Sequence, residues 1–305
     1  MTLPVSGAIS LGDVNVELQR SATATISMDD AELRTLFAVP SGAIGLASGF
    51  GKANKFAISI TSNQTNLDLR PWLVSQGWNE TSKVELTINA GVWLSSNSTS
   101  IAGLRISGSF PNGLFITNNG YIVGMGGAGT GYNTYSGAAG GAGGDGLSTS
   151  SALTLTNNGT IAGGGGGGGG GGATHNHSFY LRPQGVYSPG GPGGGGRSGL
   201  TNSYSAVNAG TSSGAGAGAG TNSTRALVTY DYNQYQTTII GGAGGSGGNW
   251  GASGAGGAGG YWSTRGQSSG PTPYGGGSGG AAGRAVAGNG YITWVTTGSI
   301  YGALV

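Results

Sequence analysis

Ten consecutive glycines occupy residues 163–172 and are followed at once by ATHNHSFY. Glycine loses more backbone freedom on ordering than any other residue, and fixing each residue costs about 1–2 kcal/mol. Such a run is therefore a flexible linker unless its backbone gains contacts with other segments. The other glycine blocks of the sequence bear on this choice.

The glycine blocks follow a spacing of three residues. In GGAGGSGGN (241–249) the non-glycine residues are Ala243, Ser246 and Asn249, and the next block continues with the same spacing. A polyproline-II helix has three residues per turn, a rise of about 3.1 Å and no internal hydrogen bonds. If such helices are buried, their N–H and C=O groups need partners, and neighbouring glycine helices can supply them laterally. The spacing therefore favours packed glycine helices over a linker.

Eight glycine tracts are recognisable, of which the fifth, GAGAGAG, has a period of two, and we number them in chain order. Because they are similar in length and separated by returning segments, we expect them to stack side by side and to alternate in direction. Consecutive connections then fall at opposite ends of the stack. Tracts one to eight are residues 124–131, 137–146, 163–172, 189–196, 214–220, 241–249, 251–260 and 275–288.

Aromatic residues divide unevenly between the two sets of connections. The segments after the odd tracts, 132–136, 173–188, 221–240 and 261–274, together carry eleven aromatic residues. The segments after the even tracts contain strand-like phrases instead, and TNNG precedes tracts one and three. The sequence thus predicts strands at a base and aromatic loops at a tip.

Composition narrows the possible functions. The 305 residues carry a net charge of +2, no cysteine and 7% charged residues, and 60 of the 71 glycines follow residue 115. A net charge close to zero gives no sign of a basic surface that would bind nucleic acid or an anionic membrane. The lack of cysteine excludes disulfides and thiolate metal sites. There is no apolar run of 18 residues and no signal-peptide layout at the N-terminus, so we expect neither a membrane span nor Sec export.

The first 120 residues predict a different kind of structure. Asp29 followed by Glu32 indicates a capping box for a helix that ends near Phe37. A second short helix is expected in NLDLRPWLVSQGW, where Pro71 is tolerable only in the first turn. Alternating runs predict strands at 56–60, 84–88, 91–95 and 104–108.

Three features together resemble a known family: the opening LPVSGAISLGDVNVEL, the stretch TINAGVWLSSNSTS, and TNNGxIxGxGG leading into glycine blocks. They resemble the glycine-rich adhesins at the tips of tailed-bacteriophage fibres, notably those of T-even-like phages. The resemblance implies a polyglycine-II sandwich whose distal loops contact an outer-membrane protein or lipopolysaccharide. It also implies an N-terminal part that docks to the tail or fibre, in a virion protein made in the host cytoplasm.

The expected fold is therefore mainly β and irregular. We expect an attachment module over 1–50, a β-rich domain with short helices over 51–120, and a polyglycine-II receptor-binding domain with strands at its base over 121–305.

Tyrosine and tryptophan in loops give a large amphipathic contact area at low entropy cost. We therefore expect the tip loops to bind the receptor, although several of these side chains could instead pack together to hold the loops. The expected receptor-binding residues are Tyr132, Tyr135, His175, His177, Phe179, Tyr180, Arg182, Tyr187, Arg225, Tyr230, Asp231, Tyr232, Tyr235, Tyr261, Trp262, Arg265 and Tyr274.

Metal binding and catalysis have weaker support in the sequence. His175 and His177 form an H-x-H pair, but two imidazoles are an incomplete ligand set, and only a trimer would bring six nitrogens together. No G-x-S-x-G elbow and no pair of loop carboxylates suited to sugar cleavage is present. We expect no enzyme activity and no cofactor. The alternatives are a structural spacer, an ice-binding plate or a surface-polysaccharide depolymerase.

Overall fold

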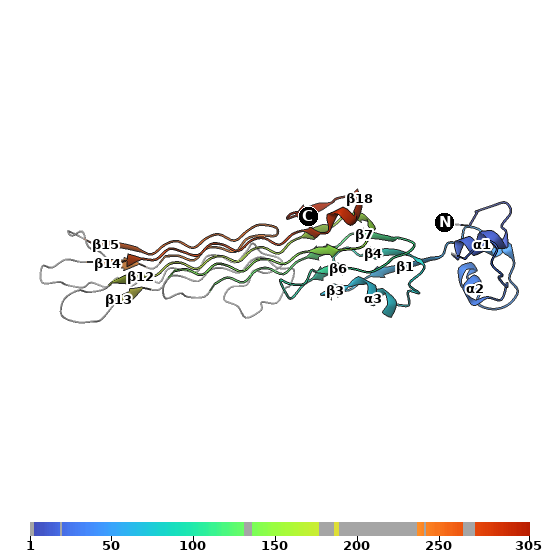
Figure 1. Ribbon diagram of the computed structural model, residues 1–305, viewed down its shortest axis with the longest axis horizontal. Coiled ribbons are helices and arrows are strands. Elements are labelled where there is room, and N and C mark those ends of the chain that lie inside the picture. The colour runs from blue at the N-terminus through green and yellow to red at the C-terminus, as the bar shows by residue number, and fades with distance from the viewer. Residues whose placement is uncertain are drawn as a thin grey trace.

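The computed structural model describes residues 3–18, 20–130, 136–176, 186–188, 237–240, 242–264 and 272–305. The molecule is elongated, with a helical unit at one end, parallel strands in the middle and extended glycine segments that run to the other end (Figure 1). The described residues are mainly strand and irregular structure with a few short helices, as predicted.

The helical unit contains α1 (Leu11–Glu17), α2 (Ala31–Phe37) and the 3-10 helix η1 (Leu46–Gly49). A capping box begins α1, because the Asp13 N–H donates to the Ser10 hydroxyl over 3.1 Å and the Ser10 N–H donates to the Asp13 carboxylate over 2.8 Å. The Ser10 hydrogen bonds lower the pKa of Asp13. The small apolar core of this unit consists of Leu3, Ile9, Val14, Leu33, Leu36 and Phe37.

The capping box predicted at Asp29 and Glu32 is wrong. Helix α2 begins one residue later, with Asp30 as its N-cap, and no side chain caps it. Asp29 instead pairs with Arg34, and the Glu32 carboxylate accepts from Arg20 over 2.7 Å. These ion pairs use the carboxylates that a capping box would need. The predicted end of the helix at Phe37 is confirmed.

The strands of the middle part form a three-sided parallel solenoid. Each coil contributes one strand to sheet A, then one to sheet B, then one to sheet C, and all pairings between successive coils are parallel. A parallel bridge between Val286 and Leu304 adds the last coil to sheet C. Sheet A contains β1 (Lys55–Ile60), β4 (Lys83–Ile88), β7 (Leu114–Asn118), β10 (Leu153–Asn157) and β18 (Ile292–Thr296); sheet B contains β2 (Gln64–Thr65), β5 (Trp93–Ser95), β8 (Tyr121–Val123), β11 (Thr160–Ala162) and β19 (Ser299–Tyr301); sheet C contains β3 (Leu67–Asp68), β6 (Leu104–Ile106), β9 (Leu147–Thr149) and β17 (Val286–Ala287).

The alternation that predicted the early strands has a simple cause here. Residues at every second position point into the solenoid, and in β4 buried and half-buried residues alternate without exception. The four strands predicted before residue 110 are confirmed as β1, β4, β5 and β6. The helix predicted around Pro71 is confirmed as α3 (Leu69–Ser75), with Pro71 in its first turn.

The repeated phrase TNNG marks one corner of the solenoid in two successive coils. Asn118 and Asn157 are fully buried there, and the side-chain amide of Asn118 donates from Nδ2 to the side-chain oxygen Oδ1 of Asn157 over 2.7 Å. The Asn118 side-chain oxygen accepts from the Gly120 N–H over 3.1 Å. The repeat therefore reflects equivalent positions of neighbouring coils.

The glycine segments are two excursions that leave the solenoid between sheets B and C. The first runs from β8 to β9, and the second runs from β11, which ends at Ala162, to β17, which begins at Val286. Sheets A to C draw strands from both sides of residue 120. The division into 1–50, 51–120 and 121–305 stays a prediction.

Backbone hydrogen bonds join the six described tracts at intervals of three residues. Tract three is antiparallel to tract two, since Gly164, Gly167 and Gly170 donate to Gly144, Gly141 and Ala138 in turn. It is parallel to tract seven, since Gly166, Gly169 and Gly172 donate to Ala252, Ala255 and Ala258. The predicted alternation of direction is confirmed for tracts one, two, three, six, seven and eight.

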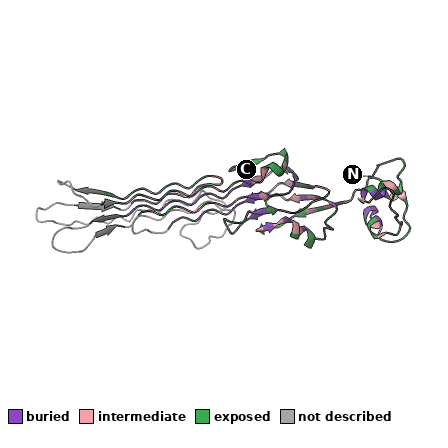
Figure 2. Ribbon diagram, in the orientation of Figure 1, coloured by how far each residue is buried: buried purple, intermediate pink, exposed green. Residues whose placement is uncertain are grey.

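Tract three lies at the centre of this lattice, and all its glycines are buried, whereas most residues of the outer tract seven are exposed (Figure 2). A Cβ at Gly166 would overlap the Gly280 carbonyl, one at Gly167 the Ala128 carbonyl, and one at Gly168 the Gly245 carbonyl. Three successive residues thus face three different neighbours. Only a run of glycine on all three faces fits this position.

Candidate functional site

The far end of the glycine lattice carries short antiparallel strands (Figure 1). Strand β12 pairs with β13 on one side and β16 on the other, while β14 pairs with β15. Each strand follows or precedes a glycine tract, so the backbone lattice continues into this end. The strands are β12 (Thr174–Asn176), β13 (Val186–Ser188), β14 (Thr237–Ile240), β15 (Tyr261–Thr264) and β16 (Thr272–Pro273).

Five of the predicted receptor-binding residues lie in the described part of this end. The backbone places His175 opposite Tyr187, and Trp262 opposite Ile239. Tyr261 is 61% exposed, and the half-buried Tyr274 donates its N–H to the Ala173 carbonyl over 2.9 Å. Twelve predicted residues lie outside the described residues: Tyr132, Tyr135, His177, Phe179, Tyr180, Arg182, Arg225, Tyr230, Asp231, Tyr232, Tyr235 and Arg265.

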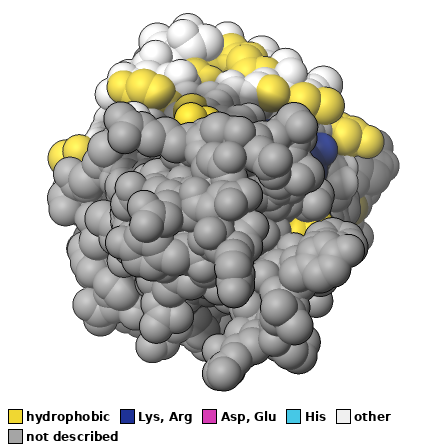
Figure 3. Space-filling view, turned by 90° about the vertical axis from the view of Figure 1, so that its left-hand side faces the viewer, with side chains coloured by type: hydrophobic (Ala, Val, Ile, Leu, Met, Phe, Trp, Pro, Cys, Tyr) yellow, Lys and Arg dark blue, Asp and Glu magenta, His cyan; other side chains and the backbone are white. Residues whose placement is uncertain are grey.

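In the end-on view, the side chains of described residues are mainly hydrophobic or uncharged, and they are visible mostly along the upper edge (Figure 3). Among the described residues no group of three or more His, Cys, Asp or Glu side chains is placed to hold a metal ion. The H-x-H hypothesis stays a prediction, because His177 lies outside the described residues.

An aromatic cluster that the sequence analysis missed lies at the other end of the lattice. Trp250 forms the turn between tracts six and seven, and its ring lies 5.9 Å from that of Trp93 and 6.0 Å from that of Tyr301. Trp93 stacks on Tyr121 of the next coil with a centroid distance of 4.1 Å. The cluster therefore joins the glycine lattice to sheet B. The one available signal was a tryptophan placed between two glycine blocks.

A charged pair links tracts two and eight next to sheet C. The Arg284 guanidinium donates to both carboxylate oxygens of Asp145, over 3.0 and 2.6 Å, and the Arg284 N–H adds a third bond of 3.0 Å. Asp145 raises the pKa of Arg284 through these contacts. The pair sets the alignment of tract two with tract eight where both return to the solenoid.

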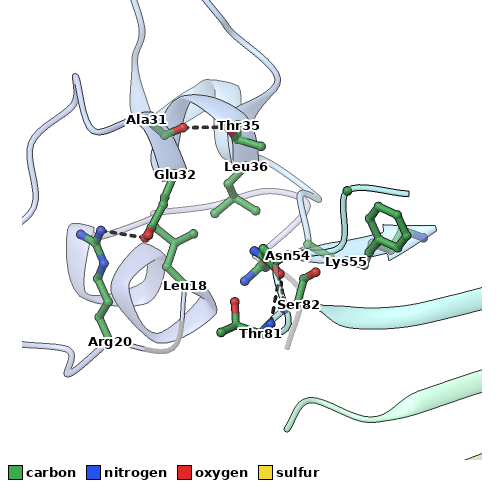
Figure 4. A pocket seen from close by; sticks show the side chains of 14 residues that line it. Leu18, Arg20, Ala31, Glu32, Thr35, Leu36, Asn54, Lys55, Thr81 and Ser82 are labelled. Atoms are coloured by element: carbon green, nitrogen blue, oxygen red, sulfur yellow. Dashed lines mark hydrogen bonds and ion pairs between the residues drawn. The ribbon is translucent and has the colours of Figure 1, made fainter. Parts of the chain in front are cut away.

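A hollow of about 610 Å³ lies between the helical unit and the first coils. Figure 4 shows Leu18 and Leu36 on the helical side and Asn54 and Ser82 on the solenoid side, with the Arg20 and Glu32 ion pair nearby. Asn54, which lines the hollow, donates its backbone N–H to the buried Glu17 carboxylate over 2.8 Å. Polar and apolar side chains both line the hollow, and it belongs to the end opposite the tip strands.

These features define a class of protein: an elongated protein in which a parallel solenoid carries an arm of hydrogen-bonded glycine segments with short antiparallel strands at its far end. A family model described as phage tail fibre adhesin Gp38 matches residues 55–305. Since the match covers most of the chain, the protein belongs to the phage tail fibre adhesin Gp38 family. It is thus a bacteriophage tail-fibre component of a family of host-attachment adhesins.

Among solved structures, the chain is similar to one in the crystal structure of the gp37-gp38 adhesin tip complex of the bacteriophage S16 long tail fibre. The two sequences are 22% identical, the TM-score is 0.48, and the alignment covers 99% of this chain and 100% of the other. No curated protein matches the sequence. In the part of the chain that the structure describes, no helix is both long and apolar enough to cross a membrane.

Proposed function

We propose that the protein mediates host adsorption by binding a bacterial outer-surface receptor, an outer-membrane protein or lipopolysaccharide, with the aromatic loops at the tip. The observation that carries the proposal is the arrangement of the arm. Among the described residues, tracts three and seven end at the tip strands β12 and β15, which supports the proposal that the aromatic-rich segments lie at one end of the arm. Recognition by such loops requires no covalent chemistry.

The support itself is proposed to be a polyglycine-II lattice. Lateral backbone hydrogen bonds recur every three residues, which is the period of the polyproline-II helix. A packed support reduces the entropy that the loops lose when they meet the receptor. A protein that served only as a spacer would need the same glycine helices, but it would need no concentration of aromatic residues at one end.

The N-terminal region is the proposed docking part, with a tail or fibre protein of the virion as its partner. It lies at the end opposite the tip (Figure 1). The similar solved structure is described as a complex between two fibre proteins, which motivates the proposal without placing an interface on this chain. We propose the same domain division as before: an attachment module over residues 1–50, a β-rich domain over 51–120 and a receptor-binding domain over 121–305.

Segment exchange tests the receptor role. Segments 173–188 and 221–240 are replaced by those of a phage with a different host range, and adsorption to both hosts is measured. Exchange of segment 197–213, which follows the even-numbered tract four and is expected at the base, serves as the matched control. We expect the tip exchanges to transfer host range and the base exchange to leave it unchanged. Unaltered adsorption after both tip exchanges would refute the assignment.

A second assay addresses catalysis. Purified protein is incubated with host lipopolysaccharide or capsule, and soluble oligosaccharide is measured. We expect none to be released, because no suitable pair of loop carboxylates is present in the sequence. Release of oligosaccharide would instead favour a depolymerase.

A further inference from the structure

A small polar hollow lies beside β6, where the solenoid meets the glycine arm (Figure 1). Its volume is about 250 Å³. The stretch TINAGVWLSSNSTS ends at this hollow with Thr99 and Ser100. Sheet C and the ends of tracts two and eight supply the other walls. Three segments that are distant in the sequence thus meet at one polar site.

The charged side chains that line the hollow are positive in sum. Arg105 and Arg284 contribute two guanidinium groups, and Asp145 contributes the one carboxylate of the lining. Asp68, which accepts a hydrogen bond from Arg105, does not belong to the lining. The hollow therefore suits an anion better than a cation.

Both arginines keep N–H donors available for a ligand. Arginine has five N–H groups in a planar fork that matches the oxygen atoms of an oxyanion. Arg105 donates from Nη2 to Asp68 over 2.6 Å, and its Nε and Nη1 make no hydrogen bond within the described part of the chain. Arg284 uses Nε and Nη2 on Asp145, and its Nη1 makes no hydrogen bond to a described residue.

Three hydroxyl groups line the same hollow, those of Thr99, Ser100 and Ser148. None of the three forms a hydrogen bond with another described residue. The half-buried Ser148 lies directly beside Arg105, because the two residues are in register in sheet C. A hydroxyl group can donate to an oxyanion or accept from a sugar hydroxyl. The hollow thus combines two guanidinium groups with three hydroxyl groups that lack partners among the described residues.

The loop that supplies Thr99 and Ser100 is held in place by its own side chains. The fully buried Ser96 accepts from the Ser98 N–H over 3.0 Å, and the Ser98 hydroxyl accepts from the Ser100 N–H over 3.2 Å. The backbone of Thr99 packs against tract two, because a Cβ added at Gly144 would lie 2.9 Å from the Thr99 Cα. A preformed site loses little conformational entropy when it binds a ligand.

We propose that this hollow binds a phosphate group, either free or carried by a saccharide. Strand β9 lies between β6 and β17 in sheet C, so Arg105 and Arg284, which precedes β17, lie on opposite sides of β9. A tetrahedral phosphate presents oxygens to both arginines, whereas a planar carboxylate matches one guanidinium fork. The hydroxyl groups of Thr99 and Ser100 are then available to a sugar ring attached to the phosphate.

This site is separate from the aromatic loops and goes beyond the receptor role proposed for the tip. It lies at the solenoid end of the arm, whereas β12 and β15 lie at the far end (Figure 1). A phosphorylated saccharide of the host surface, bound here, adds a second contact to the one at the tip. Two linked contacts increase the overall avidity without any change in either site.

An NMR titration of the full chain at constant ionic strength tests the proposal. The probes are inorganic phosphate, glucose-6-phosphate and glucose, and the signals followed are the arginine Nε–H groups and the backbone N–H of Ser148. We expect saturable shifts at Arg105 and Ser148 with both phosphates and no shift with glucose. Binding of glucose-6-phosphate at least about threefold tighter than inorganic phosphate identifies a saccharide-borne phosphate, because the hydroxyl contacts add to the affinity. Equal affinities identify the phosphate group alone.

Three variants connect the binding to this hollow. Arg105→Met should weaken the binding of both phosphates at least about tenfold, because it removes charge-assisted donors. Ser148→Ala should weaken it about threefold. Arg70→Met is the matched control: Arg70 is also a partly exposed arginine paired with one carboxylate, that of Glu80, but it does not line the hollow. Its affinity should stay within about twofold of the unmodified chain. Unchanged signals elsewhere in the spectrum show that each variant is folded.

Three results would overturn the proposal. Shifts that rise linearly with phosphate and affect Arg70 as strongly as Arg105 mean that phosphate only screens surface charge. Equal affinities of the unmodified chain and Arg105→Met mean that phosphate binds elsewhere. Binding of glucose as tight as that of glucose-6-phosphate means that the hollow recognises sugar hydroxyls without the phosphate.

Discussion

Substitution of one buried glycine and one exposed glycine by alanine separates a packed lattice from a loose tether. Gly167 lies in the central tract, donates to the Gly141 carbonyl over 2.8 Å and accepts from the Gly280 N–H over 2.7 Å. A Cβ there would overlap the Ala128 carbonyl. At Gly256, in the exposed tract seven, the nearest atom to an added Cβ is the Gly277 carbonyl oxygen at 3.4 Å.

The expected free-energy changes have opposite signs. At Gly167, overpacking costs about 1–3 kcal/mol, and distortion of two hydrogen bonds costs about 0.5–1.5 kcal/mol each. The lower backbone entropy of the unfolded alanine variant offsets about 0.4–1 kcal/mol of this cost. Gly167→Ala should therefore destabilise the protein by about 2–5 kcal/mol, whereas Gly256→Ala should stabilise it by about 0.4–1 kcal/mol.

Urea unfolding followed by circular dichroism measures both changes, with adsorption to host cells as a second readout. We expect the midpoint to fall for Gly167→Ala and to rise slightly for Gly256→Ala. Equal shifts in the two variants, or an unchanged midpoint for Gly167→Ala, would show that the central tract is not packed as described.

Three further predictions concern the solenoid and its junction with the arm. Trp250→Ala should destabilise the protein by about 2 kcal/mol, because the partly buried ring contacts Trp93 and Tyr301, and Trp250→Phe should recover most of this in thermal unfolding. Asp145→Asn should lower the melting temperature by an amount equivalent to less than about 1 kcal/mol, since Arg284 is 49% exposed, and 1 M salt should shrink the difference; a difference that persists in salt would argue against an electrostatic origin. Lys55 and then Lys83 lower the pKa of Glu85 below its ordinary value of 4.5, so its stabilising contribution is present above pH 4.5 and is lost as the pH falls through the folded-state pKa. Wild type and Glu85→Gln should therefore converge in stability below pH 4.5, and a constant difference down to strongly acidic pH would contradict this.

Local elements were predictable where a short-range rule decided them. The strands around residues 56–60 and 84–88 follow from alternation, and the helix at Pro71 follows from the place of proline in a first turn. The capping box at Asp29 was mispredicted because Arg34 and Arg20 compete for its carboxylates, and neither competitor is visible in a four-residue motif.

The solenoid was harder to predict from this sequence. Its coils differ in length, and the fourth coil is interrupted between Ala162 and Val286, so no fixed period appears. The repeated TNNG was a usable signal, since both copies occupy one corner in successive coils. The aromatic cluster at Trp250 gave almost no signal in the sequence, because the partners of Trp250 come close to it only in the folded chain.

The amino-acid sequence by itself determined the glycine tracts, because glycine at two of every three positions permits a close approach of backbones. The order of the tracts along the chain sets their alternating direction. It also placed the aromatic segments on one set of connections. Only the tertiary structure decided which glycine tract lies beside which, that β17 completes the coil begun at β10, and that residues 292–305 add a further coil. The physical reason is that backbone hydrogen bonds hold the tracts together, and one glycine carbonyl is chemically the same as any other. The partners of each tract are therefore selected by the strands and turns at the two ends.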